Sequence, residues 1–558
     1  MTRSLLIHGS CHRRRSLTLR AFAAICFFLA GAAVPARPAE KSDPAADAFL
    51  YESLLGNVDR QRVHGELMGL VVPARTDLGS RQIDAFGYKL LLGRKFKTIL
   101  LLYTAPPLVD GGVVMPQADS LPAPGGALQV DTAMRQTLEH GDSLFRLNDD
   151  AHQWSEIVRI QLGFLGTVVD HKKTLVLPLG IALTGAESTK DVSLRIAGAL
   201  EALGRNKGDV LVLMAADLSQ GFPRAKALVV DSNLLARIEQ VAGADLQSFM
   251  EQSTQGLTLS ASFPDWGPLL TGVFVLSQRV ASRGQALMYA NSAQFLTAKK
   301  VEAQKSTGLA SVAFVSGASE EVELPKDRTL KLVQALPDSL LMSLVQQSRA
   351  AVNQALEPTK ETLRPLPEKK AQNRYPVFVS LFSKDNQVVR QSGTLAAQGP
   401  LEASVKFHAA QAALISTRGP SLKKAELDAL IIGLDIPSKP ERARPDEIIQ
   451  GMDGVVANLE GRKEVFLPEQ WQLCPHRAVF LSELMAQMGV EPWRWSTRKT
   501  RLSAFQVLSI REGENKGHTA AGSVSLDSKE EKKAEKKRKK EEEAPQENPA
   551  GEDLLSPN

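Results

Sequence analysis

Unbroken apolar runs alternate with stretches of helical spacing through the first part of the chain. Between the runs, apolar residues recur at helical spacing over 191–203, 224–241 and 267–280. The runs themselves have the length and the aliphatic character of buried strands, at residues 97–105, 174–182, 209–216 and 286–291. Strands that alternate with helices are typical of a mainly parallel sheet with helices on both faces. The pattern therefore predicts an α/β domain over residues 48–320.

The pattern changes after residue 336, where strands and helices no longer alternate regularly. An apolar face predicts a helix over 339–356, and further helices are expected at 402–417 and 478–488. Apolar runs predict strands at 375–382, 427–434 and 503–510, with a shorter one near 464–467. This mixture predicts an α+β domain over residues 336–512.

The N-terminus has the three parts of an export signal. Five arginines and no acidic residue precede the apolar stretch Ala21–Val34, and Val34-Pro35-Ala36 offers small residues to a signal peptidase. We expect a signal peptide over residues 1–39 and export to the periplasm or cell envelope, with no membrane span after cleavage. The general secretory route and the twin-arginine route both stay open, and an uncleaved N-terminal anchor is the alternative.

Charge and aromatic content argue against nucleic acid as a partner. The net charge of +5 equals the five arginines that precede the apolar stretch, so the chain that follows this stretch has a net charge of zero. Aromatic residues make up only 5% of the chain, whereas proteins that bind single strands stack bases on aromatic side chains. The C-terminal residues 513–558 form charge blocks with almost no apolar residue, which predicts a disordered tail.

Two sets of short motifs resemble two families that occur together. The first set resembles the Memo family and consists of Gly69–Pro73, Gly126–Asp131, Ala151-His152 with Gln161–Leu165, Asp217–Ser219 and Tyr289–Ser292. The second resembles the AMMECR family and consists of Val377–Leu381, Gly393–Leu395, Ala425–Leu427 and Leu467-Pro468. The chain thus resembles a fusion of AmmeMemoRadiSam system proteins B and A. The resemblance implies a class III extradiol dioxygenase-like fold for the first domain and a radical-SAM protein as a partner.

The resemblance also implies where a Memo-like domain holds its metal, and those positions have changed. A hydrolytic or oxygen-activating metal centre needs about three protein ligands, commonly imidazoles with a carboxylate or thiolate. The positions of the family ligands are occupied here by Ala74, Pro106, Gln220 and Pro264. We therefore expect the metal chemistry to be lost and no cofactor to be bound.

Cysteine is scarce in both predicted domains. Cys474 is the only cysteine outside the leader, so neither an intrachain disulfide nor a cysteine-based zinc site is available. In the second domain, the AMMECR signature Arg-Gly-Cys-Ile-Gly-Thr reads Val389 to Thr394, with only Gly393-Thr394 retained. Arg390 and Gln391 are then expected to be ordinary strand-end polar residues.

A rebuilt metal site is the alternative for the first domain. The polar residues Asp149, Asp150, His152 and Glu156, together with Asp217, could hold iron or another divalent metal. The competing interpretation is a solvated loop, with a strand-end Asp217 that caps the following helix. Tyr289 and Asn291 are the candidate ligand-binding residues of the remaining cleft.

The sequence therefore predicts an exported AmmeMemoRadiSam-type protein with a catalytically degenerate Memo-like domain. That domain is expected to act as a binding or scaffold module joined to the AMMECR-like domain, with a protein of the cell envelope as partner. The alternative function is a metal-dependent, dioxygenase-like enzyme with a site around His152 and Asp217.

Overall fold

The computed structural model describes two folded units and not the two ends of the chain. The described residues are 44–106, 111–141, 143–153, 155–183, 185, 187–254, 257–279, 281, 283–295, 305–317, 336–357, 375–384, 388–397, 399–414 and 422–519. The predicted leader, residues 1–39, lies outside this part of the chain. Residues 520–558 of the predicted tail lie outside it as well.

The centre of the first domain is a parallel sheet. Its strands pair in the order β1 (Glu66–Val72), β8 (Val210–Ala215), β2 (Thr98–Thr104) and β7 (Leu175–Ile181). These strands are buried along nearly their whole length, because helices cover both faces. The strands predicted at 97–105, 174–182 and 209–216 are confirmed, and so is the predicted α/β class.

Antiparallel strands extend this sheet on one side and mixed pairs extend it on the other. Beside β1 lie β11 (Lys305–Ser316) and β10 (Arg283–Asn291), and β9 (Gln220–Pro223) pairs with β11. Beyond β7 lie the short strands β3 (Val113–Met115), β6 (Phe145–Leu147), β5 (Leu128–Val130) and β4 (Ser120–Leu121). The described sheet is therefore mixed, with a parallel centre.

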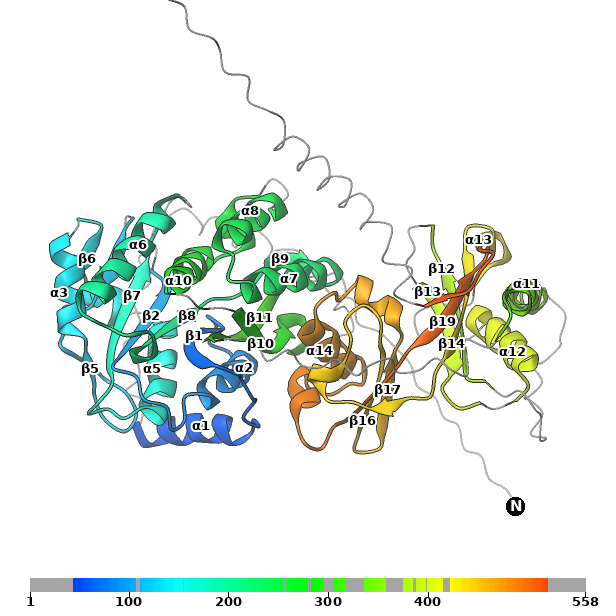
Figure 1. Cartoon of the computed structure of the whole chain (residues 1–558), viewed down its shortest axis with the longest axis horizontal. Helices are drawn as coiled ribbons and strands as arrows, with labels where there is room; N and C mark the ends of the chain where they lie inside the picture. Colours follow the sequence, from blue (N-terminus) through cyan, green and yellow to red (C-terminus); the bar gives the residue numbers. More distant parts are fainter. Residues whose placement is uncertain are drawn as a thin grey trace, which may run out of the picture.

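Helices cover the two faces of the sheet as separate groups (Figure 1). One group contains α6 (Glu187–Ala202), α8 (Gly243–Ser253) and α10 (Trp266–Gln278), and the other contains α1 (Pro44–Gly56), α2 (Leu78–Lys89) and α5 (Glu156–Val168). The helix α7 (Arg224–Glu239) packs on β10 and β11. The remaining helices of this domain are α3 (Thr132–Gly141), α4 (Asp149–Gln153) and α9 (Leu259–Ser262).

Two glycines show how closely the helices approach β1. A Cβ at Gly69 of β1 would lie 2.7 Å from Leu276 Cδ1 of α10. A Cβ at Gly87 of α2 would lie 3.1 Å from Val72 Cγ1, which is on the other face of β1. Since alternate residues of a strand point to opposite faces, α2 and α10 enclose the carboxyl end of β1 from both sides.

The second domain begins with an antiparallel sheet and two helices. Its strands pair in the order β13 (Val388–Thr394), β12 (Val377–Phe382), β14 (Ile431–Pro437), β19 (Val507–Arg511) and β20 (His518–Thr519). The helices α11 (Asp338–Ala355) and α12 (Leu401–Leu414) pack on this sheet and on each other, and α13 (Lys424–Leu427) follows α12. The predicted helices at 339–356 and 402–417 are confirmed.

A second, smaller antiparallel sheet completes the domain. Its order is β15 (Glu441–Arg442), β18 (Arg501–Phe505), β16 (Gly454–Leu459) and β17 (Arg462–Phe466), with α14 (Arg477–Gln487) packed on β17. The arrangement is α+β, as predicted. The helix predicted at 478–488 and the strand predicted near 464–467 are confirmed, with small shifts at their ends.

The strand predicted at 503–510 is wrong as a single element. The chain leaves the small sheet at Phe505 and enters the larger sheet at Val507, and Gln506 lies between them. The backbone carbonyl of Gln506 accepts a hydrogen bond from Ser438 N at 2.8 Å. One apolar run therefore supplies strands to two sheets, which periodicity alone does not reveal. The strand β20 also lies beyond residue 512, where the predicted domain ends.

The two domains share one apolar core. Buried side chains of the small sheet and α14 belong to the same cluster as the core of the first domain, whereas the larger sheet has a cluster of its own. The small sheet is thus packed onto the first domain as part of its interior.

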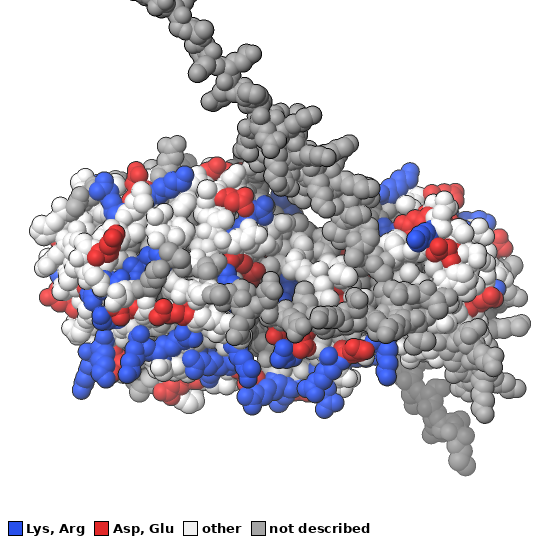
Figure 2. All heavy atoms as spheres, viewed as in Figure 1, with Lys and Arg blue, Asp and Glu red and all other residues white. Residues whose placement is uncertain are grey.

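Figure 2 shows charges of both signs on the visible face, with Lys and Arg more frequent along its lower edge.

Candidate functional site

The carboxyl ends of β1, β2 and β8 meet at one edge of the parallel sheet, where α/β proteins commonly place their sites. Ala74 follows β1 and Asp217 follows β8. The backbone N of Ala74 donates a hydrogen bond to Asp217 Oδ1 at 2.9 Å. The carboxylate that remains from the Memo pattern is therefore bonded to the backbone of the residue that replaces the first family ligand.

A second carboxyl lies against Asp217. Asp265, which precedes α10, accepts a hydrogen bond from Asp217 N at 3.0 Å and another from Thr104 Oγ1 at 2.6 Å. Burial raises the pKa of Asp265, and burial together with the charge of Asp265 raises the pKa of Asp217 well above its usual range. The pair consequently holds a proton to a higher pH than exposed aspartates do.

A third buried carboxyl comes from α2. Both oxygens of Asp84 lack a hydrogen-bond partner within the described part of the chain. Burial, followed by the charge of Asp217, raises the pKa of Asp84 well above its usual range. Beside it, Gln161 of α5 donates to the carbonyl of Pro73 at 3.2 Å and accepts from Tyr88 Oη at 2.5 Å. Protonation of Asp84 fits this buried position, where Arg81 and Gln161 offset only part of the cost of burying a charge.

The sequence did not indicate Asp84 or Asp265. A signal for Asp265 was available, because it is the next residue after Pro264, which occupies the expected cysteine position. Asp84 lies within the helix α2 and gave no such signal. Pro106, Gln220 and Pro264 themselves carry no side-chain group that serves well as a metal ligand. The residues at this edge therefore do not fit a Memo-like metal centre.

His152 lies away from the solvent, in the short helix α4. Its Nδ1 is 3.0 Å from Tyr103 Oη of β2, and its Nε2 has no hydrogen-bond partner among the described residues. Burial lowers the pKa of His152 to about 4, so the imidazole is neutral at neutral pH. The interpretation of this segment as a solvated loop is wrong at His152, because the surrounding residues exclude water from the ring.

The acidic neighbours of His152 have other partners. Asp149 Oδ1 accepts hydrogen bonds from the backbone N atoms of Gln117 and Ala118, at 2.7 and 3.1 Å, and Glu156 pairs with Arg159. Throughout the part of the chain that the structure describes, no three His, Cys, Asp or Glu side chains are grouped to hold a metal ion. Asp217 bonds to Ala74 N instead of capping a helix, which corrects that interpretation.

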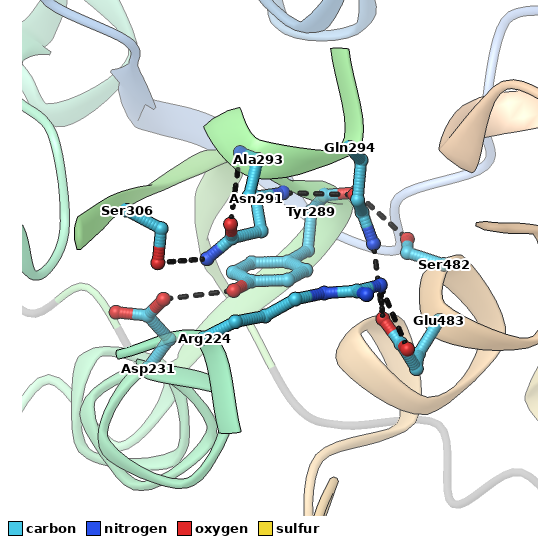
Figure 3. Close-up of polar contacts among 9 residues, drawn as sticks. All are labelled: Arg224, Asp231, Tyr289, Asn291, Ala293, Gln294, Ser306, Ser482 and Glu483. Carbon is cyan, nitrogen blue, oxygen red and sulfur yellow. Dashed lines mark hydrogen bonds and ion pairs between the residues drawn. The ribbon is translucent and has the colours of Figure 1, made fainter. Parts of the chain in front are cut away.

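Tyr289 and Asn291 are buried in β10 and bonded within the domain (Figure 3). Tyr289 Oη donates to Asp231 Oδ2 at 2.8 Å, and burial raises the pKa of Asp231 to about 6. Asn291 Nδ2 donates to Ser306 Oγ at 3.1 Å, and Asn291 Oδ1 accepts from Ala293 N at 3.0 Å. Both predicted ligand-binding residues are therefore fully buried, and their side chains form hydrogen bonds to other residues of the domain.

The junction of the two domains begins beside these residues. Arg224 Nη2 lies 2.8 and 2.7 Å from the two carboxylate oxygens of Glu483 in α14, and Gln294 Nε2 donates to Glu483 at 3.1 Å (Figure 3). Ser482 Oγ donates to the backbone carbonyl of Tyr289 at 2.7 Å. A buried charge pair and an apolar core therefore hold α14 against the first domain.

A second contact at the junction involves a histidine. His476 Nε2 lies 3.1 Å from Glu239 Oε2, and the pKa of Glu239 is below its usual range. Burial would raise that pKa, but hydrogen bonds from His476 Nε2 and from Ala286 N, together with the nearby Arg477, outweigh it. His476 also accepts from Ala478 N and so caps α14. Both ends of this contact are thus part of the packing between domains.

In the second domain, Gln391 stands within β13 and not at a strand end. Its Nε2 donates to Ser380 Oγ and to Glu469 Oε1, each at 2.9 Å. Glu469 belongs to the 3-10 turn Pro468–Gln472, and burial together with the charge of Asp435 raises its pKa to about 8. The expectation of an ordinary strand-end residue is wrong, because Gln391 links two strands to a buried carboxyl.

The first unit is an α/β domain in which the described residues at the sheet edge form no group of metal-binding side chains. It is joined to an α+β domain. Comparison with known families identifies the two parts. The chain contains a Memo-like protein domain over residues 29–306 and an AMMECR1 domain over residues 345–510. The predicted fusion is confirmed.

Individual relatives cover parts of the chain. A protein of Sulfurisphaera tokodaii is 30% identical over 22% of this chain, which spans only 56% of that relative. A MEMO1 family protein of Methanothermobacter thermautotrophicus is 20% identical over 40% of this chain and 78% of its own length. The crystal structure of an uncharacterized Pyrococcus horikoshii protein aligns with a TM-score of 0.29 and 23% identity, covering 33% of this chain and 97% of that one.

No helix within the described residues is both long and apolar enough to cross a membrane. The apolar stretch Ala21–Val34 lies outside those residues.

Proposed function

We propose that the Memo-like domain has lost metal chemistry and serves as a scaffold that holds the AMMECR domain. The observation that carries this proposal is the state of Asp217. Asp217 follows β8 at the edge of the sheet, and its carboxyl accepts a hydrogen bond from the backbone of Ala74. Histidine and cysteine donors are absent from the positions around it, where Pro106, Gln220 and Pro264 stand.

The junction supports the scaffold role. Arg224 Nη2 contacts both carboxylate oxygens of Glu483 in a largely buried ion pair, and the apolar core runs from one domain into the other. Such an interface favours a fixed orientation of the two domains, since separating them would expose the core and both charges. We infer that the first domain now supplies rigidity and surface instead of a reactive metal.

The second candidate is a metal-dependent, dioxygenase-like enzyme that uses His152 and Asp217. The buried carboxyls of Asp84, Asp217 and Asp265 are the feature that gives it some support. They lie close enough to influence one another's protonation, although they are not grouped as a ligand set. The two candidates differ most sharply in metal content.

Purified protein is expected to contain much less than one equivalent of iron, copper or zinc per chain. The reason is that the edge of the sheet lacks three imidazole, thiolate or suitably grouped carboxylate donors. Elemental analysis of tag-free protein checks this, together with an assay for ring cleavage of catechols, which should show none. One equivalent of metal, released by His152→Ala or Asp217→Ala, would support the enzyme instead.

We propose further that the chain is exported and works in the cell envelope, with a protein of that compartment as partner. The support is the arginine-rich segment, the apolar stretch Ala21–Val34 and the small residues that follow. The Memo and AMMECR1 pair also suggests a radical-SAM protein of the same system as a partner. Pull-down of the tagged exported chain from envelope extracts would test both partners.

The exported protein is expected to begin at Arg37 or Glu40, after cleavage behind Ala36 or Ala39. N-terminal sequencing of protein from the envelope fraction measures this directly. As a control, replacement of the apolar stretch by a polar segment of equal length should leave the protein in the cytosol with Met1 retained. An unprocessed wild-type chain in the cytosol would refute export.

A further inference from the structure

A cavity of about 450 Å³ lies in the second domain, between the larger and the smaller sheet. Its walls come from β12, β13, α12 and β17, so both halves of the domain contribute. This volume is in the range that binds small organic molecules. The lining residues are Phe378, Gln391–Leu395, Gln411 and Lys463–Val465.

One wall contains a serine with two polar partners. Ser392 Oγ lies 2.6 Å from Gln411 Oε1 and 3.0 Å from His408 Nδ1. A hydroxyl has one proton, and Gln411 Oε1 can only accept, so Ser392 donates to Gln411 and accepts from His408 Nδ1–H. The amino group of Gln411 takes no part in these two hydrogen bonds.

The same geometry does not favour a serine nucleophile. A general base must accept the serine proton, whereas His408 Nδ1 already donates to Ser392. His408 is buried, its Nε2 has no partner among the described residues, and burial lowers its pKa. Formation of an imidazolium there would leave a buried charge without an acceptor. The serine and histidine therefore orient Gln411 and do not activate one another.

Whereas Gln411 supplies a hydrogen-bond donor, Gln391 supplies an acceptor. Its Nε2 is already bonded to Ser380 Oγ and Glu469 Oε1. Its Oε1 is therefore the atom that remains available in a residue that lines the cavity. The cavity thus offers one amide donor from Gln411 and one amide acceptor from Gln391.

The groups around the cavity provide little net charge. Glu469, behind Gln391, has its pKa raised to about 8 by burial and by the charge of Asp435, so it is protonated at neutral pH. Lys463 and Glu464 of β17 carry opposite charges next to each other. Phe378, Leu395 and Val465 supply apolar contacts, and Ser392 and Thr394 add uncharged hydroxyls. A ligand with a net charge would be attracted by one of the side chains Lys463 and Glu464 and repelled by the other, so the lining favours neither sign of charge.

We propose that this cavity binds a small uncharged molecule through a carboxamide-type group, whose carbonyl accepts from Gln411 Nε2 and whose N–H donates to Gln391 Oε1. The apolar part of the molecule contacts Phe378 and Leu395. This assignment gives the AMMECR1 domain a binding site of its own. It does not depend on whether the first domain is a scaffold or an enzyme.

Three probes of one shape and different charge test the proposal. Benzamide is neutral, benzoate is its anionic analogue, and benzamidine is its cationic analogue. Saturation-transfer NMR titrations on the purified chain at pH 7 should show benzamide binding at least tenfold tighter than either ion. Gln411→Leu keeps the volume but removes the donor, and loss of one such hydrogen bond should weaken benzamide binding about tenfold.

Two further variants keep the outcome decisive. Gln252→Leu makes the same replacement on the exposed face of α8 in the other domain and should leave benzamide binding unchanged. Glu469→Gln mimics the protonated carboxyl, so this variant should still bind benzamide. If Glu469 were instead ionised in the wild-type chain and attracted cations, the wild-type chain would bind benzamidine and the variant would not. Circular dichroism checks that each variant is folded. Absence of benzamide binding, tighter binding of either ion, or an unaffected Gln411→Leu variant would overturn the proposal.

Discussion

Replacement of Arg224 by methionine is expected to lower the free energy of unfolding by about 3–5 kcal/mol. The variant leaves the Glu483 carboxylate buried at the domain junction, where Arg224 now contacts both of its oxygens. Gln294 would remain as a hydrogen-bond donor but brings no positive charge. Methionine keeps most of the side-chain length, so the loss is mainly electrostatic and not a packing defect.

Urea unfolding of the purified chain measures the change. Arg159→Met is the matched control, because Arg159 pairs with Glu156 on the solvent-exposed face of α5 and should cost less than about 1 kcal/mol. The double variant Arg224→Met/Glu483→Gln removes both charges and should recover most of the loss. Equal effects of Arg224→Met and Arg159→Met would show that the junction does not depend on the buried pair.

The deficit of Arg224→Met should shrink as the pH falls. Burial raises the pKa of Glu483 above its ordinary value even with Arg224 present, and loss of the arginine raises it further. A carboxyl whose pKa is higher in the folded than in the unfolded chain lowers the free energy of unfolding when it is ionised. This cost decreases as the pH falls below the folded-state pKa, and it is gone below the pKa of the unfolded chain. The unfolding curves of the wild-type chain and of Arg224→Met should therefore lie closer together at pH 5 than at pH 7. An equal separation at both pH values would show that the charge of Glu483 is not the cause.

Replacement of Asp217 by asparagine is expected to stabilise the protein at neutral pH. Asparagine can keep the hydrogen bond from Ala74 N, while it removes one of two neighbouring buried carboxyls. Each pKa unit by which folding disfavours the ionised form is worth about 1.4 kcal/mol. Because the pKa of Asp217 is raised well above its usual range, we expect the thermal midpoint to rise by about 3 °C or more.

The sign of this change separates the two candidate functions. The advantage of Asp217→Asn should fade as the pH falls, since protonation relieves the same cost in the wild-type chain. Asp150→Asn is the control, because Asp150 is exposed on α4 and its replacement should shift the midpoint by no more than about 1 °C. If Asp217 instead helps to hold a metal, Asp217→Asn would lower the midpoint and release the metal.

At the positions where the two family resemblances lead us to expect reactive side chains, this chain has other residues. In the first domain, the positions of the metal donors carry Ala74, Pro106, Gln220 and Pro264. In the second, Gln391 replaces the signature cysteine and makes hydrogen bonds to a strand and a buried carboxyl. Amide, proline and alanine side chains can bind or pack but cannot supply a thiolate or an imidazole.

The sequence alone predicted the elements that depend on local pattern. The strands β2, β7 and β8 are continuous apolar runs, because a parallel strand covered by helices on both faces has no polar face. The strand β11 was not predicted from its pattern, since Ser306, Thr307 and Ser311 interrupt its apolar residues. Those polar side chains are buried through contacts in the folded sheet, which the local sequence does not display.

The candidate sites depended on the tertiary structure. The position of Asp217 at a strand end followed from the sequence, but its neighbours Asp84 and Asp265 come from helices on opposite faces of the sheet. Likewise, Arg224 and Glu483 are 259 residues apart, and His408 reaches Ser392 from a different element. Such pairs leave no periodic signal, because the free energy that brings them together comes from burial of apolar surface elsewhere in the chain. The sequence therefore determined the two domains and the missing donors, while the packing decided which polar groups meet.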